Sequence, residues 1–288
     1  MRHDDVRFGV TAFCTDQSLG PADVARVAEA SGFDLLLFPD HTHVPTSRRT
    51  PFPGGGDLPE QYRRIHDPFV AAAYALAATT MLRVGVGVCL VPAREPIALA
   101  KTVASLDVLS EGRMVLGVGA GWNAEEVENH GVAAGDRWAV MRERVLAMKA
   151  IWSQEAASYE GDHVHFSELW SWPKPHQRPN PPILVGGHGD GVLDRVVEYG
   201  DEWLAMAAPG RPPLGERMAC LAEKAIVAGR PRPTVSVQVY GTPPPAGVVE
   251  RYIAIGVDRI DLALRHGGPE RMIQDLEVLG EIVATYRA

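Results

Sequence analysis

The run Val115-Leu116-Gly117-Val118-Gly119-Ala120-Gly121-Trp122 decides the fold assignment, together with a similar run, Val84-Gly85-Val86-Gly87-Val88. Each is a short apolar segment of the kind that forms a strand buried on both faces. Glycine weakens a strand interior, so repeated glycines indicate that another group approaches the backbone closely. We therefore predict two core strands whose C-terminal ends adjoin a large, flat ligand.

Strand-like and helix-like segments alternate outward from these runs to both ends of the chain. The predicted strands cover residues 6–13, 35–38, 83–91, 113–118, 183–185, 202–206, 234–240 and 259–264. The predicted helices cover residues 21–30, 68–80, 96–110, 139–152, 190–199, 214–228, 247–255 and 269–286. Eight such pairs predict a (β/α)8 TIM barrel with a parallel sheet rather than an open sheet.

Two segments interrupt this alternation and are predicted to be insertions within a single domain that spans residues 1–288. Residues 42–66 are rich in Pro and Gly and too long for an ordinary connection, which is typical of a functional lid. Residues 154–181 include an alternating stretch around Gly161-Asp162, which predicts a β-hairpin.

Composition narrows the class of protein. The chain has 288 residues, 46% of them hydrophobic, a formal net charge of −8 and no basic stripe, which argues against a nucleic-acid partner. Its three cysteines form no CxxC motif, and neither a signal peptide nor a membrane-spanning run is apparent. We expect a cytoplasmic protein that binds no membrane.

In a barrel, residues that follow the strands carry the chemistry. Gly186-Gly187-His188-Gly189 lies between a strand and a helix, where free N–H groups could bind a phosphate, although a tight turn would also explain the glycines. His41 is either a proton-transfer residue or a structural histidine. Cys14, Trp122 and Met206 also follow strands and are candidates for the substrate pocket.

A metal site is an alternative, because His41-Thr42-His43 has the HxH spacing of metal-dependent barrel hydrolases. The companion ligands at later strand ends are not evident, so we expect no metal. Arg48-Arg49 and Arg63-Arg64 could recognise an acidic group, but solvated surface charge is the preferred interpretation.

With these pieces placed, the chain resembles the bacterial luciferase-like monooxygenase superfamily, in particular its coenzyme F420-dependent branch. The resemblance is carried, in order, by Phe38-Pro39-Asp40-His41, Asp67-Pro68, the two glycine-containing runs, Pro96-Ile97-Ala98-Leu99-Ala100-Lys101, Leu106–Arg113, Pro182–Gly187 and Tyr199–Trp203.

The resemblance implies a flavin or deazaflavin lying across the C-terminal end of the barrel. It implies that a bulge at Gly87-Val88, often with a non-proline cis peptide, backs the central ring, and that Gly119-Ala120-Gly121 lines its pyrimidine side. Gly186–Gly189 would then hold the phosphate. Asp40 would belong to the cofactor seat, and His41 would lie near the reactive carbon.

The chain departs from the sugar-phosphate dehydrogenases of this superfamily. Trp122 takes the position that matches their acidic Glu, and Met206-Ala207-Ala208 replaces their phosphate-binding residues. Glu202 replaces a more usual Gly, for which the sequence offers no account. We therefore expect an apolar or aromatic substrate.

The predicted function is hydride transfer between F420 and an unidentified organic substrate. The alternative is a two-component monooxygenase that uses reduced FMN. A metal-dependent hydrolase and a non-catalytic flavin-binding protein are weaker alternatives. The expected partners are a flavin or F420 reductase and, from the resemblance alone, a second copy of the chain in a homodimer.

Overall fold

The computed structural model describes residues 6–206 and 212–287, and within them eight parallel strands close into a barrel. Their order around the barrel is β1-β10-β9-β8-β7-β4-β3-β2. The strands are β1 (Arg7–Thr11), β2 (Leu35–Phe38), β3 (Arg83–Leu90), β4 (Met114–Gly119), β7 (Ile183–Gly186), β8 (Glu202–Met206), β9 (Thr234–Val239) and β10 (Arg259–Ala263). The prediction of a (β/α)8 barrel is confirmed.

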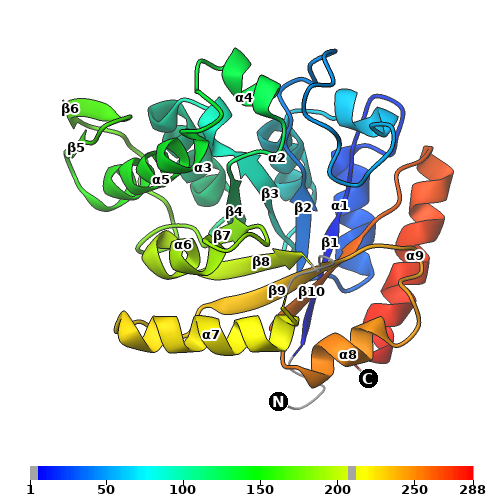
Figure 1. The fold of residues 1–288 in the computed structure, drawn as a ribbon. Coiled ribbons are helices and arrows are strands. Elements are labelled where there is room, and N and C mark those ends of the chain that lie inside the picture. The colour runs from blue at the N-terminus through cyan, green and yellow to red at the C-terminus, as the bar shows by residue number, and fades with distance from the viewer. Residues whose placement is uncertain (1–5, 207–211, 288) are drawn as a thin grey trace.

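Helices flank the barrel on the outside (Figure 1). They are α1 (Pro21–Ala30), α2 (Pro68–Ala78), α3 (Pro96–Leu109), α4 (Ala124–Asn129), α5 (Arg137–Ser153), α6 (Val192–Tyr199), α7 (Leu214–Val227), α8 (Val248–Ala254) and α9 (Pro269–Thr285). Local chemistry sets several of their starts: Asp67 and Glu95 each accept two backbone N–H bonds ahead of Pro68 and Pro96. Among the described residues, no helix is long and apolar enough to cross a membrane.

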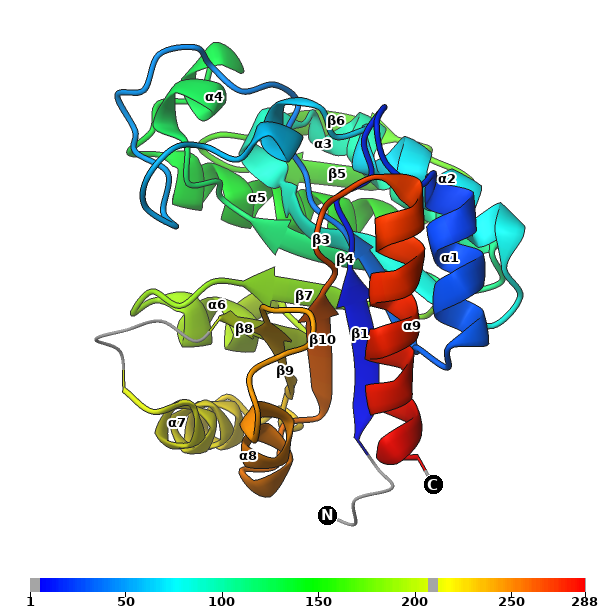
Figure 2. The ribbon, with the colours of Figure 1, turned by 90° about the vertical axis from the view of Figure 1, so that its right-hand side faces the viewer.

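The predicted hairpin is present as β5 (Ala157–Glu160) and β6 (His165–Leu169), which pair antiparallel. Residues 42–66, which we call the lid, contain the short 3-10 helix η2 (Glu60–Arg63), and a second one, η3 (Val91–Ala93), follows β3. The lid and α4 lie together beyond the C-terminal ends of β1 to β4 (Figures 1 and 2). We call these strand ends the mouth of the barrel.

The barrel interior is divided into two chemically different halves. One half is apolar and consists of Leu35, Leu37, Val115, Leu184 and Leu204, with Val88 packed against them. The other half is polar and lies along β8, β9, β10 and β1. Because side chains alternate along a strand, the remaining strand residues face outward and pack under the helices.

The polar half is organised around Arg259, whose side chain is only 2% exposed. Its guanidinium donates to both carboxylate oxygens of Glu202, to both of Asp261 and to the hydroxyl of Ser236. Glu202, which the sequence left unexplained, therefore neutralises a buried arginine. Gly9 is required beside this network, since a Cβ there would lie 2.0 Å from Asp261 Oδ1.

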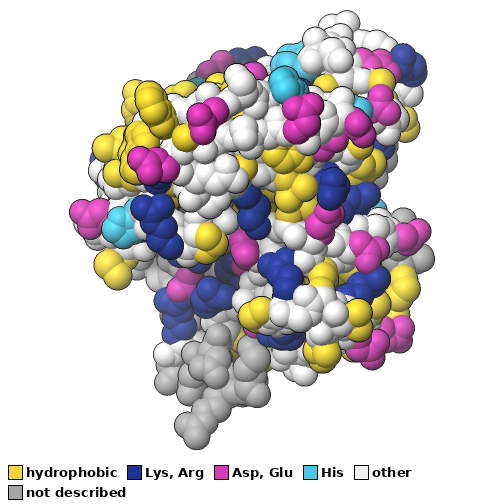
Figure 3. All heavy atoms as spheres, turned by 90° about the vertical axis from the view of Figure 1, so that its left-hand side faces the viewer, with side chains coloured by type: hydrophobic (Ala, Val, Ile, Leu, Met, Phe, Trp, Pro, Cys, Tyr) yellow, Lys and Arg dark blue, Asp and Glu magenta, His cyan; other side chains and the backbone are white. Residues whose placement is uncertain are grey.

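Charges of both signs are interspersed on the face of the molecule that Figure 3 shows. The lid arginines follow the same pattern: Arg49 pairs with Glu128, Arg63 with Glu60, and Arg64 with Asp16 and Glu60. These pairs are mostly solvated, in agreement with the preferred interpretation of surface charge.

Candidate active site

A buried histidine–carboxylate pair lies at the mouth. His41 Nδ1 is 2.6 Å from Glu126 Oε2, and the two side chains are 6% and 1% exposed. The other Glu126 oxygen accepts the backbone N–H of Thr42 at 3.0 Å. His41 Nε2 forms no hydrogen bond with any residue that the structure describes. Because Nδ1 is hydrogen-bonded to the Glu126 carboxyl group, Nε2 is the ring nitrogen left able to exchange a proton with a ligand.

The elements that carry this pair are β2 and α4. His41 follows the end of β2, and Glu126 is in the first turn of α4, where Asn123 caps the helix by accepting the N–H of Glu126. Neither α4 nor Glu126 was predicted from the sequence. The resemblance implied that Trp122 takes the place of an acidic residue, but the fold brings a carboxylate to His41 from four residues further on.

Helix α4 also holds the first part of the lid. Glu125 accepts the hydroxyl of Ser47 and the backbone N–H groups of Arg49 and Thr50, and Arg49 pairs with Glu128. A hydrogen bond from Thr50 lowers the pKa of Glu125 to about 2. One short helix thus fixes both the lid and the orientation of His41.

His43 is turned away from His41 and toward α4. Its Nε2 lies 2.8 Å from Asn129 Nδ2, and Thr42 Oγ1 lies 2.9 Å from His43 Nδ1 and 2.7 Å from His130 Nε2. The HxH pair therefore does not converge on one point. Residues 6–206 and 212–287 contain no group of three or more His, Cys, Asp or Glu placed to hold a metal ion.

Aromatic rings surround His41. Tyr62 and Trp122 lie edge-on to it, with ring centroids 5.5 and 5.8 Å away. Phe52 of the lid contacts both Tyr62 and Trp122, and Phe13 contacts Tyr62. The lid therefore contributes two of the rings at the mouth, and the surroundings of His41 Nε2 are apolar.

Asp40 is buried and bound to its own protein. Its carboxylate accepts the backbone N–H of Leu90 at 2.9 Å and two bonds from Arg94. Burial alone would lower the pKa of Arg94, but the hydrogen bond and charge of Asp40 outweigh it and raise that pKa. Any contribution of Asp40 to a cofactor seat is thus indirect, through the end of β3 that it anchors.

The peptide bond Gly87-Val88 is cis, as the resemblance implied, and the register of β3 against β4 shifts between Val86 and Cys89. The side chain of Val88 fills the space beside the glycines of the neighbouring strands. A Cβ on Gly119 or Gly186 would lie 2.6 Å from a Val88 methyl carbon. At Gly119 and Gly186 the absence of a side chain therefore makes room for Val88 of the β3 bulge.

The loop Gly186–Gly189 has the features of an anion seat. The backbone N–H groups of His188 and Gly189 donate to no described residue, and His188 Nδ1 is buried without a partner. Arg217 donates to the carbonyls of His188 and Gly189, and its guanidinium lies 4.7 Å from the ring centroid of Trp203. Two unpaired backbone N–H groups and a buried, unpaired imidazole nitrogen in a loop of this kind fit a phosphate.

The remaining pocket candidates are at different places on the mouth. Cys14 is buried, and burial raises the pKa of its thiol to about 12. Met206 ends β8 and is 39% exposed, whereas Ala207 and Ala208 lie outside the described residues. Tyr240 donates to Gln238 of β9, which donates to Thr11 of β1, two strands away in the barrel.

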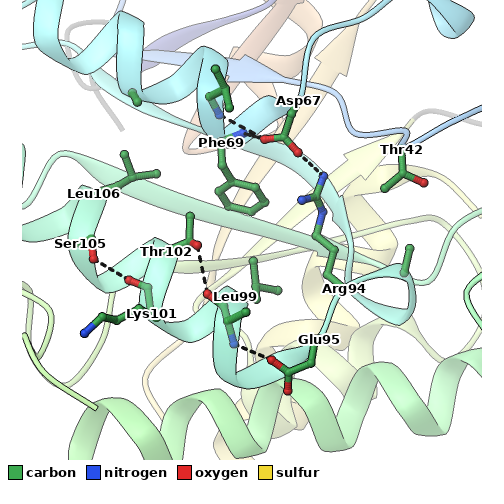
Figure 4. Close-up of a pocket in the computed structure, with 14 residues that line it drawn as sticks. Thr42, Asp67, Phe69, Arg94, Glu95, Leu99, Lys101, Thr102, Ser105 and Leu106 are labelled. Atoms are coloured by element: carbon green, nitrogen blue, oxygen red, sulfur yellow. Dashed lines mark hydrogen bonds and ion pairs between the residues drawn. The ribbon is translucent and has the colours of Figure 1, made fainter.

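A large cavity lies away from the mouth, between α2 and α3 (Figure 4). Its volume is about 740 Å3, and Phe69, Leu99 and Leu106 line its apolar part, with Lys101 and Thr102 beside them. Arg94 bridges Asp67 at its edge to the buried Asp40. This cavity shares Thr42 with the lid but contains neither His41 nor Glu126.

Comparison with known proteins gives the family. Residues 21–278 match the sequence profile of the luciferase-like monooxygenases. The chain belongs to this family. It is therefore related to oxidoreductases that act with flavins or with F420.

The relatives differ in cofactor. An uncharacterized protein of Mycobacterium tuberculosis, Rv0953c, is 42% identical over 208 residues, 71% of each chain. The FMNH2-dependent dimethylsulfone monooxygenase of Pseudomonas putida is 30% identical over 185 residues. This aligned region is 62% of this chain and 46% of the monooxygenase. An F420-dependent secondary alcohol dehydrogenase has the same fold, with a TM-score of 0.77, 17% identity and full coverage of both chains.

Proposed function

We propose that this protein is an F420-dependent oxidoreductase that passes a hydride between the deazaflavin and an uncharged, apolar or aromatic organic substrate at the mouth. The observation that carries the proposal is the buried His41–Glu126 pair, whose free Nε2 lies among aromatic rings. Preference for F420 over FMN rests on the sequence resemblance to the F420-dependent branch, since structures of both an F420-dependent dehydrogenase and a monooxygenase, RslO1 from Streptomyces bottropensis, share the fold over nearly all of this chain. The dimethylsulfone monooxygenase, by contrast, extends well beyond this chain.

The cofactor seat would be built from three places. Gly186, Gly187, His188 and Gly189 would bind the phosphate through free N–H groups and His188 Nδ1. Val88 would support one face of the ring from the bulge of β3, and Gly119-Ala120-Gly121 would flank it. When bound, the deazaflavin supplies or accepts the hydride.

The role proposed for His41 is to move the accompanying proton. Loss of a hydride from a substrate carbon leaves a proton to be removed from the neighbouring heteroatom, and His41 Nε2 would accept it. Glu126 is the positioning residue: it holds Nδ1–H and stabilises the charge that His41 gains. In the reverse direction, His41 returns the proton.

The substrate would lie under the lid, against Trp122, with Cys14 and Met206 at the margins of the pocket. The raised thiol pKa keeps Cys14 neutral, so it serves as an apolar surface. Closure of residues 42–66 would exclude water, because Phe52 and Tyr62 cover His41 and Trp122.

The cofactor is tested by titrating the apo protein with F420 and with FMN while following fluorescence. Tight binding of FMN without binding of F420 would reject the first choice and favour a two-component monooxygenase supplied with reduced FMN by a reductase. Stoichiometric binding of either cofactor, without acceleration of its reduction or reoxidation, would indicate a non-catalytic flavin-binding protein.

The role of His41 is tested with two variants. His41→Ala should lower turnover by about 10²–10⁴-fold and change cofactor affinity little, because proton transfer contributes about this much. His43→Ala is the matched control, since His43 binds Asn129 and not Glu126. Equal losses of turnover and affinity in His41→Ala would make His41 a binding or structural residue.

We propose that the chain forms a homodimer through the cavity between α2 and α3. Its apolar lining lies beside Val70 and Tyr74, which are 56% and 64% exposed. Val70→Glu should then convert a dimer to a monomer in sedimentation experiments, whereas an unchanged dimer would place the interface elsewhere.

A further inference from the structure

A second cavity, of about 350 Å3, lies at the N-terminal end of the barrel, opposite to the mouth. Its lining includes the first residues of three strands: Arg7 of β1, Arg83 of β3 and Arg259 of β10. The starts of β1 and β10 are side by side, and the end of α9 lies near them (Figure 2).

Strand register shows that these arginines point into the barrel. Arg7 pairs in register with Arg259, whose side chain is inside the barrel with Glu202 and Asp261. Arg83 pairs in register with Leu35, a member of the apolar interior cluster. Residues in register on neighbouring strands share a face of the sheet, so Arg7 and Arg83 project into the same end.

Within the described part of the chain, one of the three guanidinium groups has carboxylate partners. Arg259 is saturated by Glu202 and Asp261, whereas Arg7 and Arg83 form no side-chain hydrogen bond or ion pair with any residue in 6–206 or 212–287. Burial, and then the charge of Arg259, lowers the pKa of Arg83. Glu202 and Asp107 act on Arg83 only through their more distant charges, so its guanidinium has no direct anionic partner among the described residues. Partial burial of a guanidinium without such a partner is costly.

The two acidic residues of the cavity are already engaged. Glu29 accepts the backbone N–H groups of Thr80, Met81 and Leu82. Asp34 accepts the N–H of Phe8 and pairs with Arg287. Both carboxylates are thus directed at other donors, and Arg7 and Arg83 remain to receive an anion.

We propose that this end of the barrel is an anion-binding site, in which Arg7 and Arg83 bind a small oxyanion of the phosphate class. Guanidinium groups bind such anions with paired N–H···O bonds. The anion is either free inorganic phosphate or the phosphate group of a larger ester. Since the site is remote from His41, its effect is on stability: an anion that binds only the folded chain raises its free energy of unfolding.

The test is thermal unfolding of the purified full chain in millimolar inorganic phosphate, compared with chloride at the same ionic strength. Wild-type protein should show a concentration-dependent rise in Tm, with binding confirmed by calorimetry. Arg83→Gln and Arg7→Gln should each weaken phosphate binding at least about tenfold. Arg26→Gln, which removes an arginine from an exposed pair with Asp23, is the matched control and should bind normally.

Several outcomes would overturn the proposal. If phosphate still binds to both Arg83→Gln and Arg7→Gln, it binds at another site, and the Gly186–Gly189 loop would be tested next. An equal rise in chloride would be an ionic-strength effect. If phosphate binds only after Asp4 and Asp5 are replaced by Asn, Arg7 and Arg83 are partners of the chain's own carboxylates and not of an external anion. If Arg83→Gln does not fold, Arg83→Lys keeps the charge but loses the paired N–H donors, so it should bind phosphate more weakly than the wild type, and unchanged affinity would overturn the role of Arg83.

Glycerol phosphate and phenyl phosphate distinguish the two sources of anion. Competition by both esters would mean that the cavity admits a phosphorylated molecule. Competition by neither, with phosphate still bound, would make inorganic phosphate the ligand. Neither result depends on the cofactor bound at the mouth, so failure of this proposal leaves the proposed function intact.

Discussion

Replacing Gly119 by Ala would place a methyl carbon 2.6 Å from Val88 Cγ2, whereas carbon–carbon contacts are favourable only from about 3.5 Å. The backbone of Gly119 does not have a positive φ, so Ala is penalised only by this contact. Overpacking of this kind costs about 1–3 kcal/mol. We expect Gly119→Ala to lower the free energy of unfolding by this amount.

The clash should disappear when Val88 is shortened. Val88→Ala removes two partly buried methyl groups and should cost about 1–2 kcal/mol, at about 0.8 kcal/mol for each fully buried group. The double variant should then be about as stable as Val88→Ala alone. Gly117→Ala is the control, because its Cβ would lie 2.3 Å from the carbonyl oxygen of Val86, which Val88→Ala does not remove.

The assay is urea unfolding followed by tryptophan fluorescence. It is applied to a double-mutant cycle of wild type, Gly119→Ala, Val88→Ala and the double variant, and to the matching cycle with Gly117→Ala. The cycle should give a coupling energy of about 1–3 kcal/mol for Gly119 with Val88, and a clearly smaller one for Gly117. If the changes in the free energy of unfolding from Gly119→Ala and Val88→Ala add within about 0.5 kcal/mol, the explanation that Gly119 makes room for Val88 is refuted.

Three further predictions concern other parts of the molecule. Glu202→Gln should cost about 3–5 kcal/mol in urea unfolding, because it breaks a buried pair with Arg259, and a cost below about 1 kcal/mol would contradict that pairing. Burial, and then the charge of a neighbouring histidine, lowers the pKa of His130. Neutral His130 therefore stabilises the fold above about pH 6.5, and this stabilisation is lost as the pH falls through the lowered pKa. The Tm difference between wild type and His130→Asn should shrink on acidification, and a constant difference would argue against this titration. Ellman's reagent near pH 8 should label Cys220 rapidly and Cys14 only on unfolding. The reason is that Cys220 is exposed, whereas burial raises the pKa of the Cys14 thiol to about 12. Fast labelling of the folded Cys220→Ser variant would contradict the burial of Cys14.

The barrel could be predicted because its strands are short runs, most of them largely apolar, that alternate with helix-like segments, and several of the helices open with proline. The sequence signals at Pro21, Asp67-Pro68 and Pro96 agree with the observed helix starts. Local chemistry and the global fold point the same way at these positions, which is why they can be recognised without the structure.

The carboxylate of the site escaped prediction because α4 has only six residues and few apolar positions. A signal was present: Asn123 followed three residues later by Glu126 is close to the capping-box pattern at a helix start. The pattern locates the helix, but not the destination of the Glu126 side chain, which turns to His41 instead of the helix end.

Contacts between distant strands were equally hidden. Glu202 and Arg259 are separated by 57 residues, and only closure of the barrel brings β8, β9 and β10 to adjacent positions. The resemblance implied the bulge at Gly87-Val88, but it did not indicate that Val88 would pack closely against Gly119 and Gly186.

The divided interior of the barrel has a consequence for how this protein can be altered. Leu37, Val115 and Leu184 can be exchanged for other aliphatic residues of similar volume at small cost, so the shape of the pocket floor is open to gradual change from this side. On the polar side of the barrel, replacing Asp261 or Arg259 alone leaves an unpaired charge buried in the interior. Laboratory evolution of new substrate preferences should therefore accumulate substitutions at the apolar interior positions of β2, β4 and β7 and leave Glu202, Arg259 and Asp261 nearly untouched.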